Sequence, residues 1–260
     1  MFNAVAGAPH GLTHKQLGVN HKTVDRIYAA YPTCLRSFVE KKEQGIKYGV
    51  LQKWSDVEAD EFDIRATIDK DAEPHEKKQW EQWGGLVERG NRETLLLTRL
   101  HPKKTVSHAP GPGPIRQAEW EQIGKKHLAG TNVILHTDGA RSYKLKIPGV
   151  IHDHIVHKKK LLKTKAGTVV KRHGKPVWVK PKFAKVVTHV LPDGRSLRVK
   201  AGTQVIDRFW EHARKYLKGV SSKVGSLHLR TRLRHAQFDY WYTGQDLWCK
   251  AGEAITSLHA

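Results

Sequence analysis

The sequence predicts an α/β domain with a five-stranded mixed sheet and flanking helices, preceded by a small helical module. Three observations lead to this fold class. Three segments before residue 100 read as neighbouring strands, the first with alternating residues. An apolar run at 132–135 then ends abruptly in Thr137-Asp138-Gly139, as a buried strand does at the rim of a sheet. Apolar residues at helical spacing follow over 203–217, which predicts an amphipathic helix.

The composition is that of a folded, basic protein. A length of 260 residues gives room for one ordinary domain and a small one. Eight Trp and 38% hydrophobic residues indicate a packed core. The chain has no apolar run long enough to span a membrane, and Met1–Gly7 lacks the layout of a signal peptide. Its two cysteines, Cys34 and Cys249, cannot form a zinc site alone and are expected to be free thiols.

The positive charge is concentrated in one half of the chain. Between Arg141 and Arg234 there are 25 Lys and Arg residues against four acids, an excess that equals the net charge of +21 of the whole chain. The rest of the chain is therefore nearly neutral. A basic half beside a neutral half predicts a surface that binds a polyanion such as nucleic acid.

Residues 10–31 predict two short helices. The first covers 12–17, with Thr13 as its cap, and Asn20 caps a second helix over 21–28 after a glycine turn. This layout is typical of a helix-turn-helix that binds DNA, and an ordinary helical hairpin is the alternative. An apolar stripe on the second helix leaves three polar residues exposed as candidate DNA contacts: Lys22, Thr23 and Arg26.

The remaining elements follow in a defined order. A polar helix is expected over 35–44, and later helices over 115–128, 203–217 and 237–248. The predicted strands cover 56–64, 79–87, 94–100, 132–138 and 150–156, with a hairpin turn at 89–92 and a loop at 108–114. Three antiparallel strands, a helix, and two more strands with helices between them are the order of a ribonuclease-H-like fold.

Two domains are expected: a helix-turn-helix module over 1–50 and a ribonuclease-H-like domain over 51–250. The stretch 158–200 is lysine-rich and reads as a basic insertion within the second domain. Short strands at 177–179 and 186–188 and a turn at 192–195 are expected in it.

Three separated acids are the candidate catalytic and metal-binding residues. Asp60 lies on the first strand, Asp138 at the end of the fourth, and Asp207 on the amphipathic helix. Carboxylates hold the pair of Mg²⁺ ions that stabilises charge during phosphoryl transfer on nucleic acid. The pattern therefore predicts a site for two ions, Mg²⁺ or Mn²⁺. Glu61 and Asp63 are alternatives to Asp60 but face the other side of an alternating strand.

Five segments then resemble one family, the ISXO-two-like insertion-sequence transposases of the DDE superfamily, over roughly residues 10–248. Two resemble its acidic motifs, Val57–Glu61 and His136–Tyr143, and Trp83–Arg89 is similar to its second strand. Val156-His157-Lys158 resembles a histidine that follows its next strand. Thr203–Lys215 resembles its helix reading Thr-Asn-Thr-Ile-Glu-x-x-Trp-x-x-x-Lys, with Gln204, Asp207 and Arg214 in place of Asn, Glu and Lys. The N-terminal Cys pair that many members carry is not present in this sequence.

The resemblance implies a DDE transposase that binds element-end DNA and uses Mg²⁺ to cut and join strands. Asp60, Asp138 and Asp207 would hold the metal, with Gln204 as a further ligand and Glu211 as a rival to Asp207. The implied DNA contacts in the second domain are Arg141, His157, Lys158, Lys159, Lys160 and Arg214. His152, His154 and His157 could instead form a zinc cluster, although only the first two share a strand face.

The expected partners are double-stranded DNA, as element ends and target, and further copies of the chain assembled on DNA, with no membrane. The protein would then work in the nucleus of a eukaryote, or otherwise in the cytoplasm or nucleoid. The alternative function is a catalytically inactive, domesticated DNA-binding protein derived from a transposase. An RNA-binding structural protein would not require clustered carboxylates.

Overall fold

The computed structural model describes residues 2–49, 53–156, 160–180, 182–220 and 223–258. They form two compact units. The helix-rich unit consists of Met1–Lys47, Glu61–Gly113 and Arg208–Ala260, and the parallel-strand unit of Tyr48–Asp60 and Pro114–Asp207. The predicted domain boundary at residue 50 lies outside the described residues, so the predicted division stays a prediction.

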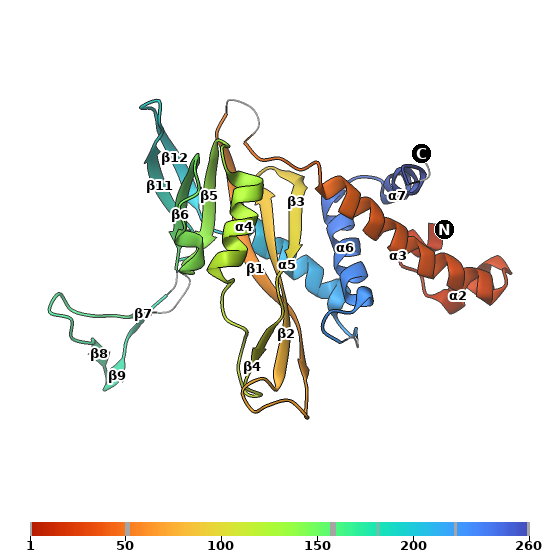
Figure 1. The fold of residues 1–260 in the computed structure, drawn as a ribbon, viewed down its shortest axis with the longest axis horizontal. Helices are drawn as coiled ribbons and strands as arrows, with labels where there is room; N and C mark the ends of the chain where they lie inside the picture. The colour runs from red at the N-terminus through yellow and green to blue at the C-terminus, as the bar shows by residue number, and fades with distance from the viewer. Residues whose placement is uncertain (1, 50–52, 157–159, 181, 221–222, 259–260) are drawn as a thin grey trace. The chain divides into compact units, whose positions relative to one another are not determined.

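The fold is mixed α/β and contains a six-stranded mixed sheet (Figure 1). Its strand order is β3-β2-β1-β5-β6, and the short β4 pairs with β2. β2 runs antiparallel to β3 and β4, whereas β1 and β6 run parallel to β5. The strands are β1 (Ser55–Ile68), β2 (Lys78–Glu88), β3 (Asn91–Arg99), β4 (Lys103–Thr105), β5 (Val133–Asp138) and β6 (Val150–Ile155).

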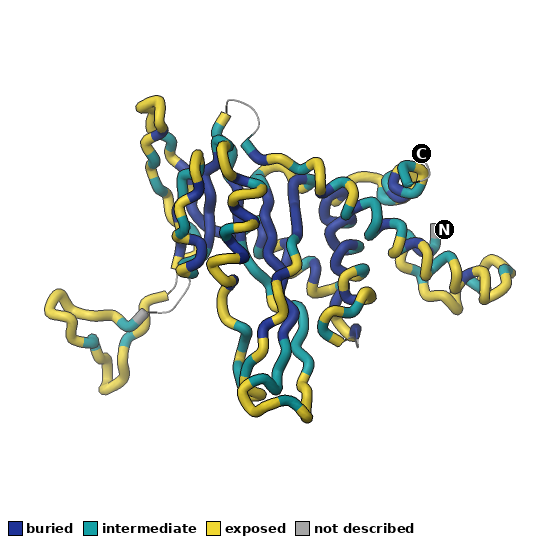
Figure 2. The backbone as a smooth tube through the Cα atoms, viewed as in Figure 1, coloured by how far each residue is buried: buried dark blue, intermediate teal, exposed yellow. Residues whose placement is uncertain are grey.

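β5 is the central strand of the parallel-strand unit. Residues 133–137 are all buried, because β1 and β6 pair with its two edges (Figure 2). Helix α4 (Gln117–Leu128) precedes β5 and the 3-10 helix η1 (Ser142–Lys144) follows it. The two helices pack together through the Trp120 ring, which meets the Tyr143 ring edge-on at 4.7 Å. These contacts fix both ends of β5.

Short strands fill the basic segment of the parallel-strand unit. β11 (Lys185–Val190) and β12 (Ser196–Ala201) form an antiparallel hairpin. The four strands before it contain two residues each: β7 (Lys160–Leu161), β8 (Lys171–Arg172), β9 (Lys175–Pro176) and β10 (Trp178–Val179). The strands predicted near 178 and 187 and the turn at 192–195 are therefore confirmed.

A buried carboxylate joins helices to the sheet in the helix-rich unit. Glu43, at the end of α3, accepts hydrogen bonds from the Leu97 amide (2.7 Å) on β3 and from Arg234 (2.6 Å) and Gln237 (2.7 Å) on α6. Gln237 also donates to the Leu95 carbonyl (2.8 Å). The helices of this unit are α1 (Phe2–Val5), α2 (His10–Leu17), α3 (His21–Glu43), α6 (Leu227–Trp241) and α7 (Leu247–Thr256). Helix α5 (Gln204–Leu217) starts in the parallel-strand unit and belongs to the helix-rich unit from residue 208 onward.

The structure confirms most predicted strands and the turn chemistry of the N-terminal helices. The predicted strands lie within β1, β2, β3, β5 and β6 to within one or two residues, and β4 was not predicted. Gly18 ends α2 with a positive φ of 61°, and the Asn20 side chain accepts a hydrogen bond from the Lys22 amide (2.9 Å). Both predicted helices are therefore present, whereas their action on DNA stays a prediction.

Several helix predictions were wrong. Thr13 does not cap α2, which begins at His10; the Thr13 hydroxyl instead hydrogen-bonds the Tyr28 hydroxyl (2.7 Å). The two helices predicted over 21–28 and 35–44 are one helix, α3, which continues through Pro32. Proline in a helix is unfavourable by about 3 kcal/mol, and the burial of Tyr31, Leu35 and Val39 along α3 offsets this cost.

The last predicted helix, 237–248, was also wrong, because the chain turns between α6 and α7. The Asp246 carboxylate accepts a hydrogen bond from the Trp248 amide (2.9 Å) and so starts a new helix. Between β5 and β6 the structure has only η1 where a full helix was expected.

Candidate functional site

One face of the parallel strands carries five acidic residues. Glu58 pairs with His136 across β1 and β5, and His136 pairs with Asp153 across β5 and β6. Side chains alternate along a strand, so residues two apart share a face. The acidic face therefore contains Asp56, Glu58 and Asp60 on β1, Asp138 on β5 and Asp153 on β6.

Asp60 and Asp138 lie on this face beyond the paired residues of β1 and β5. Each lies two residues beyond the Glu58–His136 pair, towards the carboxyl ends of neighbouring parallel strands. Both are half-buried, and the Asp138 carboxylate accepts a hydrogen bond from the Ala140 amide (2.8 Å), which turns the chain after β5. Glu61 and Asp63, the alternatives to Asp60, point to the other side of β1 by alternation.

Glu58 fixes the start of α5 on the acidic face. Its side chain is 1% exposed, and its Oε2 accepts hydrogen bonds from the amides of Val205 (2.6 Å) and Ile206 (3.0 Å). A carboxylate is favourable there because the first amides of a helix have no partners within the helix and carry partial positive charge. Glu58 thus caps α5 from a distant strand.

Asp207 lies in the first turn of α5, directly after the two residues whose amides bind Glu58. Its Oδ2 accepts a hydrogen bond from the buried Thr203 hydroxyl (3.1 Å). Gln204 is the first residue of α5 and is half-buried, whereas Glu211 is exposed. The parallel-strand unit therefore contains all three predicted catalytic acids and Gln204.

A histidine–carboxylate network lies on the same face and was not predicted. The fully buried His136 ring places Nδ1 2.7 Å from Asp153 and Nε2 2.8 Å from Asp56. The second oxygen of Asp153 lies 2.8 Å from Nε2 of His189 on β11. An ionised carboxylate only accepts hydrogen bonds, so His136 satisfies both acids when each ring nitrogen carries a proton. The network ties β1, β5, β6 and the β11–β12 hairpin together.

Asp153 is held in its ionised form. Burial alone would raise the pKa of its carboxyl, but the hydrogen bonds and charges of His136 and His189 outweigh burial and hold the pKa below its usual range. The alternation of polar residues at positions 56, 58 and 60 and at 136 and 138 was the sequence signal for this network. Of these residues, only Asp60 and Asp138 were predicted from the sequence to be functional.

The proposed histidine cluster is not a complete site in the described part of the chain. His152 and His154 do share a strand face, with ring centroids 6.0 Å apart, as predicted. His152 is engaged with the Thr137 hydroxyl (2.9 Å), and burial lowers its pKa to about 4. His157 lies outside the described residues.

The predicted DNA contacts fall into three groups. Lys22, Thr23 and Arg26 are exposed on the first two turns of α3, and Arg141 is exposed just after β5. Lys158 and Lys159, like His157, lie outside the described residues. Lys160 begins β7, but its side chain is outside them too. Binding of DNA by these residues stays a prediction.

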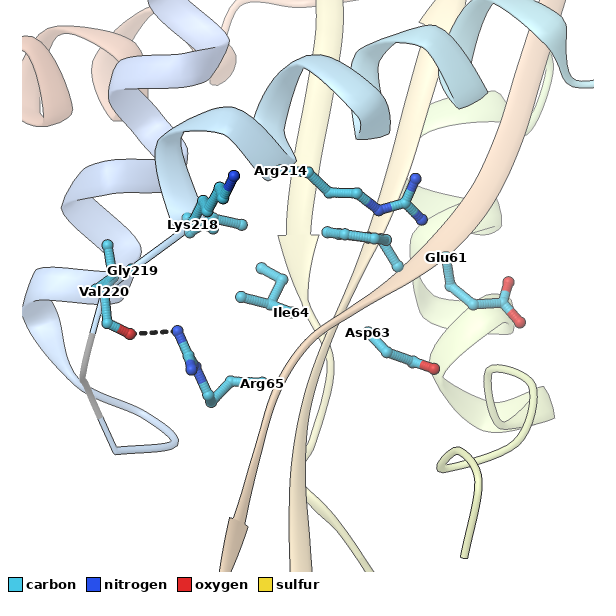
Figure 3. A pocket seen from close by; sticks show the side chains of 10 residues that line it. Glu61, Asp63, Ile64, Arg65, Arg214, Lys218, Gly219 and Val220 are labelled. Carbon is cyan, nitrogen blue, oxygen red and sulfur yellow. Dashed lines mark hydrogen bonds between the residues drawn. The ribbon is translucent and has the colours of Figure 1, made fainter.

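Arg214 lines an open pocket of about 860 Å³ in the helix-rich unit (Figure 3). Its guanidinium lies 4.7 Å from the Phe62 ring, and Phe62 stacks on Trp210 at 5.2 Å. Arg65 donates a hydrogen bond to the Val220 carbonyl across the pocket. Stacking fixes the Arg214 cation at the surface, where it can meet an anion.

The donor types of the acidic face fit Mg²⁺ or Mn²⁺, which prefer carboxylate oxygens. Asp60, within β1, and Asp138, at the end of β5, are the half-buried acids that the sequence predicts as metal ligands on this face. Within the described ranges, however, no three His, Cys, Asp or Glu side chains are grouped closely enough to hold one. In a site with Asp207 as the third ligand, the Thr203 hydroxyl would orient the carboxylate through Oδ2.

Comparison with protein-family models and with curated proteins found no match for this chain. Among the described residues, no helix is both long and apolar enough to cross a membrane.

Proposed function

We propose that this chain is a DDE-type transposase that binds element-end DNA and carries out metal-dependent strand cleavage and transfer. The observation that carries the proposal is the parallel register of β1 and β5. By strand alternation Asp60 and Asp138 share one face, each two residues beyond the last pair of that register, Glu58–His136, and Glu58 also anchors the helix of Asp207. The order of strands and helices is in keeping with a ribonuclease-H-like fold.

In this proposal Asp60, Asp138 and Asp207 hold two Mg²⁺ ions, with Gln204 as a possible neutral ligand. The ions would activate the attacking oxygen and neutralise charge on the phosphate. Glu58 sets the position of Asp207 by capping α5, and His136 sets the position of Asp138 by joining β5 to both neighbouring strands. The chain's excess of cations attracts the DNA backbone.

A plasmid-nicking assay with Mn²⁺ tests the proposal. Asp138→Asn removes a metal ligand with little change of shape, and we expect nicking to fall more than about 100-fold. Asp193→Asn is the matched control, since Asp193 is an exposed turn residue paired with Arg195. Binding of Mn²⁺, followed by its paramagnetic resonance, should weaken in the first variant only. Equal nicking and Mn²⁺ binding in both variants would overturn the proposal.

A catalytically inactive DNA-binding protein is the second candidate. Gln204 and Asp207 favour it, because they stand in place of the family's Asn and Glu, and the Asp207 carboxylate reaches one methylene less far than a Glu. It predicts salt-sensitive DNA binding with neither nicking nor Mn²⁺ binding by the unmodified protein.

A further inference from the structure

Residues 160–180 and 182–185 form a basic arm. Backbone hydrogen bonds join its segments. The Leu162 amide donates to the Val177 carbonyl (2.8 Å), the Val170 amide to the Leu162 carbonyl (2.8 Å), and the Val177 amide to the Val170 carbonyl (2.9 Å). At its tip, His173 and Gly174 have positive φ values of 50° and 75°, as a two-residue hairpin turn requires. Three short chain segments thus hold one another in place.

The arm exposes its large apolar side chains. Trp178 is 55% exposed and Phe183 57% exposed, and Leu162 and Val179 are exposed as well. In Figure 2 most of this segment is coloured as exposed. Exposed aromatic rings on an ordered backbone offer flat faces to a ligand, at little cost in side-chain entropy.

The charge of the arm has one sign. It contains nine Lys and Arg residues and no Asp or Glu. The described cationic side chains are all exposed: Lys163, Lys165, Lys171, Arg172, Lys175, Lys180, Lys182 and Lys185. Such a surface attracts a polyanion, and the aromatic rings give it a second means of contact.

We infer that the basic arm binds single-stranded DNA, with Trp178 stacked on an unpaired base and the surrounding lysines on phosphates. Cationic surfaces with exposed aromatic rings bind single strands, because unpaired bases present their faces whereas a duplex hides them. The inference rests on the proposed function only in taking DNA as the polyanion.

The test compares two exposed tryptophans in the full-length protein. Trp178→Ala removes the stacking ring, and Trp248→Ala, on α7 with 43% exposure, is the matched control. Binding of a labelled oligothymidylate of about 16 nucleotides, and of a duplex of equal length, is followed by anisotropy in EDTA. We expect Trp178→Ala to weaken oligothymidylate binding by about 5- to 100-fold and to change duplex binding by less than about twofold. Trp248→Ala should change its affinity for either oligonucleotide by less than about twofold.

Charge variants complete the test. Replacing Lys171 and Arg172 by Gln should weaken binding of both oligonucleotides, since phosphate contacts do not distinguish them. Unchanged oligothymidylate binding in Trp178→Ala would overturn the inference. Binding of the variants to phosphatidylserine vesicles is measured as well. If Trp178→Ala lost binding to the vesicles while its binding to both oligonucleotides was unchanged, the inference would also be overturned, and the arm would be assigned to a membrane surface. Because EDTA excludes metal-dependent cleavage, failure of the proposed catalytic function would leave these results intact.

Discussion

Each unit buries a polar network, and the two networks differ in how their charges balance. In the helix-rich unit Glu43 and Glu40 face Arg234 and Arg230, two negative charges against two positive, and the neutral Gln237 completes the cluster. In the parallel-strand unit Asp56 and Asp153 share His136, and three further acids lie on the same face. A balanced network serves to hold elements together. An excess of carboxylates also attracts a cation, which is why we place the proposed metal site there.

The largest expected effect concerns the balanced network. Glu43→Ala removes the closest carboxylate of the buried Arg234 and leaves it only the longer 3.8 Å contact with Glu40 as an ion pair among the described residues, and we expect a loss of about 3–5 kcal/mol in the free energy of unfolding. Glu121→Ala is the control, since Glu121 pairs with Lys125 on the exposed side of α4; its loss should stay below about 1 kcal/mol. Urea unfolding measures both. Similar losses in the two variants would show that Glu43 does not anchor α3.

Asp153→Ala should cost less, about 2–4 kcal/mol, because histidines can release a proton when their partner is removed and arginine cannot. The exposed Asp193→Ala should leave the urea midpoint nearly unchanged. The comparison between the networks breaks if the loss for Asp153→Ala exceeds that for Glu43→Ala.

His152 predicts a pH dependence of stability. Its pKa of about 4 in the folded protein lies below the ordinary value of 6.5, so the unfolded chain takes up a proton first as pH falls. The contribution of His152 to the free energy of unfolding is therefore fully present above pH 6.5. It declines as pH falls towards 4, by at most about 3 kcal/mol. His152→Gln should flatten the pH profile of the urea midpoint, and replacing the exposed loop residue His108 by Gln should not. An unchanged slope in His152→Gln would contradict the prediction.

The smallest effect on stability is expected outside both networks. Lys171→Gln, on the exposed basic arm, should leave the melting temperature unchanged. DNA binding measured between about 50 and 200 mM salt should nevertheless lose about 0.7–0.9 from the slope of log affinity against log salt. Lys125→Gln is the control, because Lys125 is paired with Glu121 on α4. A slope that both variants change equally would argue against a specific role for the arm.

Local sequence patterns predicted the strands because alternation and apolar runs are set by the faces that each strand buries. The 132–135 run and the Thr137-Asp138-Gly139 stop gave β5 and its end. The continuous α3 could not be predicted, because Pro32 favours a break locally and only packing of residues such as Leu35 and Val39 keeps the helix intact.

The candidate site was predicted only as separate residues. Asp60, Asp138 and Asp207 could be named from the sequence, but the cap that Glu58 provides for α5 joins positions 147 residues apart. Contacts of this kind leave no local pattern. The pairing of His136 with two carboxylates depends in the same way on the register of three strands, which alternation alone does not determine.

The Glu58 cap has a consequence for how the chain matures during synthesis. Its partner amide follows 147 residues later, which at about 5–20 residues per second is a delay of roughly 7 to 30 seconds. During that interval Glu58 has already been synthesised, but the start of α5 has not. The helix that carries Asp207 is therefore anchored late, so a nascent chain holds Asp60 and Asp138 before it holds the third acid. Ribosome-bound chains that stop before residue 205 would lack the anchored Asp207 altogether.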